Sequence, residues 1–168
     1  MTKPLVICSS STGNTRIIAH AVADAADTVI TAADVLPEDL SGFNPVCLCF
    51  WCDRGMAPED IKAIAPKFEK KQIACFCTMG GDPTTERSVA WMEKTAKELV
   101  DAGCCNTLEA TFLCRGRIDP ELFARMTAMM GGKEDPARQA RRDASETHPD
   151  RLDVLNAQEV YKKAFSQH

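Results

Sequence analysis

The sequence has no long apolar run and no excess of positive charge. No apolar stretch approaches the roughly 20 residues that a membrane-spanning helix needs, and residues 1–3 lead into the first strand pattern without the core of a secretory signal. The net charge of −4 disfavours non-specific binding to nucleic acid. A chain of 168 residues, 45% hydrophobic and 26% charged, is expected to form one cytoplasmic globular domain, 1–168, with no membrane or nucleic-acid partner.

Two common phosphate-binding motifs are also missing. The stretch between Ile7 and Ile17 has neither the G-x-x-x-x-G-K-[ST] pattern of triphosphate sites nor the G-x-G-x-x-G pattern of dinucleotide sites. In their place, between an apolar run and an amphipathic helical pattern, stand Ser9, Ser10, Ser11, Thr12, Gly13, Asn14 and Thr15. Hydroxyls and the free N–H groups of a helix N-terminus bind a single phosphate without a lysine, so this loop predicts a mononucleotide. The alternative is a serine-rich turn that only caps the helix.

Apolar strand patterns alternate with amphipathic helix patterns along the chain. Strands are expected at 4–8, 28–32, 45–51, 72–77 and 106–114, and helices at 14–26, 58–70 and 85–102. The strand at 45–51 is apolar throughout, which indicates that both of its faces are covered. Five strands alternating with helices predict an α/β fold with an open parallel sheet.

An additional segment at about 115–149 precedes the last helix. Asp119-Pro120-Glu121 is typical of a helix start and Gly131-Gly132 of a helix end. The apolar stripe of this helix consists of Leu122, Phe123, Met126, Met129 and Met130. We expect the stripe to join the core, although methionine-rich surfaces also bind partners. Residues 133–150 are charged and predict a solvated excursion before a final helix that Asp150 caps.

Nine cysteines raise the question of a metal centre. Cys47 and Cys49 lie two apart in one predicted strand, and Cys75 and Cys77 in another, so each pair faces one side of the sheet and makes a poor chelate. There is no second C-x-x-C motif, and only three histidines are present. We therefore expect no metal ligands and no obligatory disulfides, as suits free thiols in a reducing compartment.

The stretch Ser10-Ser11-Thr12-Gly13-Asn14-Thr15 after the first strand resembles the phosphate loop of flavodoxins, in which Ser/Thr-x-Thr-Gly-Asn-Thr binds the phosphate of FMN. The resemblance covers nearly the whole chain. It implies a five-stranded sheet of order 2-1-3-4-5 with helices on both faces and FMN at the carboxyl ends of the strands. Pieces at 51–55, 77–81 and 114–120 resemble a short-chain subgroup of anaerobic bacteria that includes flavodoxin-like companions of a bilirubin reductase.

In flavodoxins the loops after the third and fourth strands flank the flavin ring. The resemblance therefore assigns to the ring site Trp51, Cys52, Asp53, Gly55, Thr78, Met79, Gly80, Gly81 and Asp82. Trp51 stands where such proteins place a stacking aromatic, although a core tryptophan is the alternative. Gly55 can reorient its peptide at little steric cost, which offers the reduced flavin a carbonyl acceptor. The second loop has no Tyr or Trp, so one ring face is expected to be open.

These features predict an FMN-binding electron carrier without catalytic residues of its own, because the chemistry belongs to the flavin. It would take electrons from a reductase or ferredoxin and pass them singly to an oxidoreductase. Two alternatives stay open: a small FMN-dependent reductase acting directly on a quinone or tetrapyrrole, and an interaction module that has the fold without the cofactor.

Overall fold

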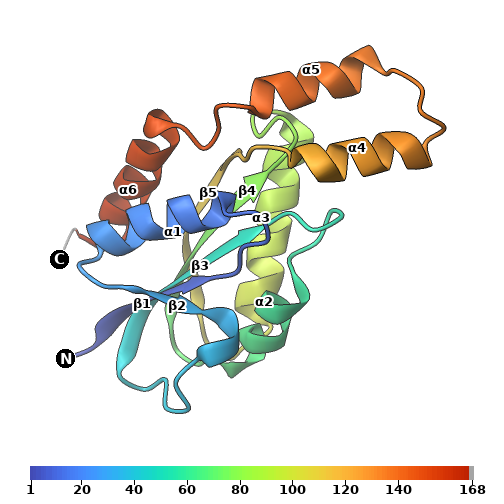
Figure 1. Cartoon of the computed structure of the whole chain (residues 1–168). Helices are drawn as coiled ribbons and strands as arrows, with labels where there is room; N and C mark the ends of the chain where they lie inside the picture. The colour runs from blue at the N-terminus through green and yellow to red at the C-terminus, as the bar shows by residue number, and fades with distance from the viewer. Residues whose placement is uncertain (167–168) are drawn as a thin grey trace.

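The computed structural model describes residues 1–166, and its centre is a five-stranded parallel sheet. The strands lie in the order β2-β1-β3-β4-β5 (Figure 1). They are β1 (Lys3–Cys8), β2 (Ile30–Ala32), β3 (Phe43–Trp51), β4 (Gln72–Met79) and β5 (Thr107–Arg115). The predicted α/β class and strand order are confirmed.

Helices cover both faces of this sheet. The helices α1 (Asn14–Ala25) and α6 (Arg151–Phe165) pack on one face, and α2 (Glu59–Ile64) and α3 (Glu86–Asp101) on the other (Figure 1). Strand β3 supplies Cys47 and Cys49 to the first core and Val46, Leu48 and Phe50 to the second. Its unbroken apolar sequence thus follows from burial on both sides.

The helix expected at 58–70 is shorter than the pattern predicted. The α-helix α2 ends at Ile64 and continues as a single 3-10 turn, η2 (Ala65–Lys67). Pro66 has no N–H to donate to Lys62 and its ring crowds the Lys62 carbonyl, so the regular α-helix ends before this position. A second short turn, η1 (Ala33–Val35), follows β2. None of the helices within residues 1–166 is both long and apolar enough to cross a bilayer.

The segment after β5 forms an arm of two helices, α4 (Pro120–Met129) and α5 (Pro136–Ser145), that projects from the sheet (Figure 1). The expectation that the α4 stripe joins the core is wrong, because no residue of α4 is buried and Met129 is 86% exposed. Periodicity shows that a helix has an apolar face but not what covers it. The charged stretch 133–150 is largely exposed, yet it contains α5, which its composition did not predict.

The two arm helices hold each other through one aromatic ring. Phe123 of α4 lies under the guanidinium groups of Arg138 and Arg142 of α5, 5.2 and 5.5 Å from the ring centroid. Such cation–π contacts stabilise a pair by about 0.5–1 kcal/mol at exposed sites. The two arm helices are therefore held together by this cation–π contact, because α4 contributes no buried residue to the core of the sheet.

Helix α6 starts with a capping box, as Asp150 predicted. The Asp150 carboxylate accepts from the Asp153 amide (2.9 Å), and the Asp153 carboxylate accepts from the Asp150 amide (2.8 Å) and contacts Nδ1 of His148 (2.6 Å). The backbone hydrogen bond lowers the pKa of Asp150. His148, Asp150 and Asp153 lie close enough together for a metal, but these hydrogen bonds already account for them.

We expect Asp150→Ala to lower the free energy of unfolding by about 1 kcal/mol, because it removes the cap of a helix that packs on the sheet. Asp135→Ala removes the equivalent cap of α5, in the arm, and should change global unfolding much less. Urea denaturation of both variants measures this. Because the folded pKa of Asp150 is lowered, the difference between wild type and Asp150→Ala should hold at pH 7 and shrink as the pH falls through that pKa. Equal losses for the two variants contradict the assignment.

Candidate functional site

Four loops meet at the carboxyl edge of the sheet and line a cavity of about 170 Å³. They follow β1, β3, β4 and β5, whose carboxyl ends lie at the same edge because all the strands are parallel. The sequence-predicted residues among its lining are Ser10, Ser11, Thr12, Asn14, Thr15, Trp51, Cys52, Thr78, Met79 and Gly80. Residues far apart in the chain are thus brought to one site.

The loop before α1 leaves its main-chain donors free. Gly13 adopts the left-handed conformation (φ 99°) at the N-cap, and no side chain caps the helix. Within residues 1–166 the amides of Thr12, Asn14 and Thr15 donate to no acceptor, and the first turn of α1 contains no acidic residue. Unpaired N–H groups at the positive end of a helix form an anion site.

Two hydroxyls of this loop face the protein. Ser9, which is buried, donates to Oδ1 of Asp60 at the start of α2 (2.9 Å) and does not line the cavity. The Thr15 and Thr78 hydroxyls are buried and lie 2.9 Å apart in a hydrogen bond. These contacts tie the loop to α2 and β4 and fix its position. The exposed side chains of Ser11 and Thr12 face the opening of the cavity.

On the other side of the cavity, Trp51 and Cys52 are followed by a tight turn. Asp53 and Met56 exchange two backbone hydrogen bonds (2.8 and 2.9 Å), and both central residues, Arg54 (φ 51°) and Gly55 (φ 78°), are left-handed. This is a type I′ turn, and glycine suits its second position. Asp53 and Gly55 lie beside the cavity and not in its lining.

Trp91 on α3, which the sequence analysis did not assign to the site, fixes this turn. Its indole N–H donates to the Gly55 carbonyl at 2.8 Å. The Gly55 carbonyl is therefore already paired. The Arg54 carbonyl is the one in the turn that accepts no hydrogen bond from residues 1–166. The Arg54 carbonyl is therefore the freer acceptor of the two, with both of its lone pairs available.

Asp82 and Gly81 lie outside the cavity lining. The Asp82 carboxylate accepts from the Thr84 amide (2.9 Å) and hydroxyl (2.7 Å) and lies 3.5 Å from the Arg115 guanidinium. The hydrogen bonds from Thr84 lower the pKa of Asp82, with a smaller contribution from Arg115. Asp82 therefore organises the turn into α3 and the junction with β5.

The sequence analysis missed the contribution of the segment after β5. The cavity is also lined by Gly116, Arg117, Ile118, Asp119 and Leu122. The Asn14 side chain donates to the Arg117 carbonyl (2.9 Å) and fills the space beside Gly116, where a Cβ would lie 2.7 Å from its Nδ2. The sequence could have indicated these residues by their place in the chain, because they directly follow the carboxyl end of a parallel strand, where ligands bind.

Ile118 packs on the loop that has no aromatic residue. Its Cγ1 would lie 3.0 Å from a Cβ at Gly80, so the Ile118 side chain packs closely on the Gly80 backbone. The Ile118 amide donates to the fully buried Ser145 hydroxyl (3.0 Å), and Arg117 pairs with Glu146 (3.0 Å). Both ends of the arm are thus attached at the edge of the cavity.

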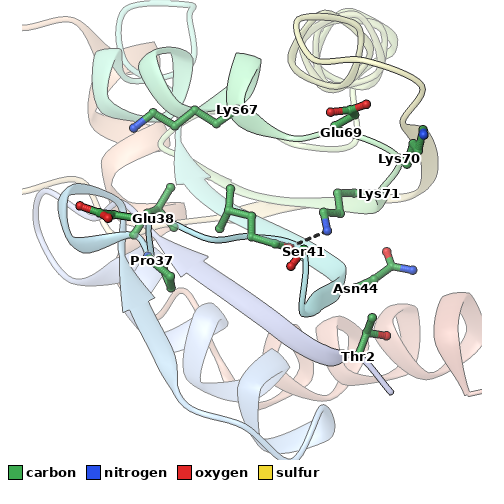
Figure 2. A pocket seen from close by; sticks show the side chains of 11 residues that line it. Thr2, Pro37, Glu38, Ser41, Asn44, Lys67, Glu69, Lys70 and Lys71 are labelled. Atoms are coloured by element: carbon green, nitrogen blue, oxygen red, sulfur yellow. Dashed lines mark hydrogen bonds between the residues drawn. The ribbon is translucent and has the colours of Figure 1, made fainter.

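A larger hollow of about 840 Å³ lies at the opposite, amino edge of the sheet. Figure 2 shows its lining, which contains both lysines and glutamates; the Lys71 ammonium donates to the Leu40 carbonyl (2.6 Å). It is formed by residues before or at the starts of β1, β3 and β4, among them Thr2, Asn44 and Lys67. Mixed charges and a lysine used to hold a loop favour a structural role, so the smaller carboxyl-edge cavity is the candidate site.

Comparisons with known proteins agree with the fold. A flavodoxin domain model matches residues 5–162. The flavodoxin-like domain-containing protein BilS of Clostridioides difficile is 27% identical over 164 residues, which cover 92% of each chain.

Solved structures give the same fold. The WrbA-like flavodoxin of Agrobacterium tumefaciens aligns over the whole of both chains (TM-score 0.59, 14% identity). The two-electron reduced flavodoxin of Megasphaera elsdenii aligns over 67% of this chain and 85% of its own (TM-score 0.51, 20% identity). Because the domain model matches nearly the whole chain and the strand order is that of the fold, this protein belongs to the flavodoxin family.

Proposed function

We propose that this protein binds FMN at the carboxyl-edge cavity and carries single electrons between redox proteins. The observation that carries the proposal is the uncapped N-terminus of α1, whose free amides lie in one cavity with Trp51. Free amides and the hydroxyls of Ser11 and Thr12 suit a phosphate, and an aromatic face suits a flavin ring. FMN would supply the redox chemistry.

The chain's own residues would position the cofactor. The amides of Thr12, Asn14 and Thr15 would bind the phosphate, Trp51 would lie against one ring face, and the Arg54 carbonyl would accept from a ring N–H. Ile118 and Leu122, which line the same cavity, would cover the other face in place of an aromatic residue. The protein would receive electrons from a reductase or ferredoxin and pass them to an oxidoreductase.

Replacing Thr12 with Ala should weaken FMN binding by about 1–3 kcal/mol, because it removes a hydrogen bond to a charged group. Riboflavin has no phosphate, so its affinity should stay the same. Thr107→Ala, at the amino end of β5, is the matched control. Flavin fluorescence titrations measure all of these affinities. Equal affinity of the wild-type protein for FMN and riboflavin contradicts the phosphate loop.

Leu122→Ala should weaken binding of FMN and riboflavin alike, by about 1 kcal/mol, because it removes apolar contact with the ring that both ligands share. Met129→Ala is the control, since Met129 lies on the same stripe of α4 but is 86% exposed and outside the cavity. The flavin fluorescence titrations described above measure both affinities for each variant. If Leu122→Ala binds both flavins as the wild type does, α4 does not cover the ring.

The loaded protein should accept electrons one at a time and react slowly with NADH or NADPH, because its one clear anion site would hold the flavin phosphate. Photoreduction monitored by absorbance and electron paramagnetic resonance should reveal a one-electron-reduced, paramagnetic form. Stopped-flow mixing with each nucleotide should produce little bleaching. Rapid two-electron bleaching without a paramagnetic form favours the direct reductase, and failure to bind any flavin favours the cofactor-free module.

A further inference from the structure

Cys104 and Cys105 form an exposed pair of adjacent thiols in the turn between α3 and β5. Their Sγ atoms lie 3.2 Å apart. The other seven cysteines are buried or half-buried. This pair takes no part in the carboxyl-edge cavity, because it precedes β5 and so lies at the opposite, amino edge of the sheet.

The backbone of this turn is held in place. The Cys104 amide donates to the Phe68 carbonyl (3.0 Å), and the Lys70 amide donates to the Cys104 carbonyl (2.8 Å). Cys105 adopts a left-handed conformation (φ 57°) that places its side chain beside that of Cys104. Figure 2 shows the neighbouring segment with Glu69 and Lys70. The backbone positions of both residues are thus fixed, and the thiols lie side by side on them.

The distance between the sulfurs restricts what can bridge them. A disulfide bond of about 2.05 Å would have to close a small ring across the intervening trans peptide bond. With metal–sulfur bonds of about 2.3 Å, a linear centre needs sulfurs about 4.6 Å apart and a tetrahedral centre about 3.8 Å. At 3.2 Å the pair suits a single bridging atom whose bonds meet near a right angle. Trivalent arsenic is pyramidal and has such bonds.

The number of protein ligands at this pair, two, also suits an atom that binds two sulfurs. Among residues 1–166 the one group of three side chains spaced for a metal is His148, Asp150 and Asp153, so Cys104 and Cys105 have no third ligand beside them. The hydrogen bond to Cys105 raises the pKa of the Cys104 thiol. Condensation with a trivalent arsenical releases both thiol protons as water, so the bound form carries no thiol protons.

We propose that Cys104 and Cys105 together bind trivalent arsenic compounds, with both sulfurs bonded to one arsenic atom. With arsenous acid, two S–H and two As–OH bonds break, two As–S bonds form and two water molecules leave. No atom changes oxidation state, so no oxidant or reductant is needed. The proposal goes beyond the flavin function and does not rest on it.

The test uses phenylarsine oxide, which has one phenyl group and two positions for sulfur. After anaerobic incubation with one equivalent, intact-mass spectrometry of the wild-type protein should show one phenylarsenic adduct that a small dithiol removes. Cys104→Ser and Cys105→Ser should each weaken this binding at least tenfold, because one sulfur is then lost. Cys52→Ser, which changes the half-buried thiol beside the other cavity, should bind as the wild type does.

Circular dichroism of each variant checks that it is folded, and the flavin titration of the arsenic-bound protein should be unchanged. An adduct that survives in both Cys104→Ser and Cys105→Ser, or no adduct in the folded wild-type protein, overturns the proposal. A failure to bind flavin leaves this outcome unaffected, so the two proposals fail separately.

Discussion

The parallel alignment of all five strands is the constraint on which the rest of this structure depends. Parallel neighbours require crossover connections, and the helices in those connections cover both faces of the sheet. The same alignment brings the loops after β1, β3, β4 and β5 to one edge. A site there needs no dedicated scaffold, because the hydrogen bonding of the sheet already positions its four loops.

Within that edge, Asn14 connects the loop before α1 to the arm. Its side chain contacts the Thr12 hydroxyl and the Arg117 carbonyl, so the start of α1 and the end of β5 share one residue. Gly116 leaves the space that this side chain fills. The position of the arm is therefore coupled to the loop through Asn14. Ile118 and Leu122 of the arm segment also line the cavity on the side of the loop after β4, which has no aromatic residue.

The cysteines divide by environment rather than by chemistry. Cys47, Cys49, Cys75 and Cys77 are fully buried along β3 and β4, and burial raises the pKa of each, to about 12 for Cys75. Such thiols behave as small apolar side chains. Cys104 and Cys105 have the same side chain on an exposed turn, where access to solvent makes chemistry possible.

The sequence by itself determined the fold class, the strands and the position of the loop before α1, because each depends on local patterns: apolar runs for strands, helical periodicity and the motif from Ser10 to Thr15. It also indicated the cap at Asp150, since a side chain and its nearest amides are neighbours in the chain. The family resemblance supplied the strand order and the loops around Trp51 and Gly80. Only the tertiary structure decided which face of α4 is covered, that Trp91 pairs with Gly55, and that Ile118 and Leu122 line the cavity. These contacts join residues far apart in the chain, and neither periodicity nor spacing along the sequence specifies which distant surfaces meet.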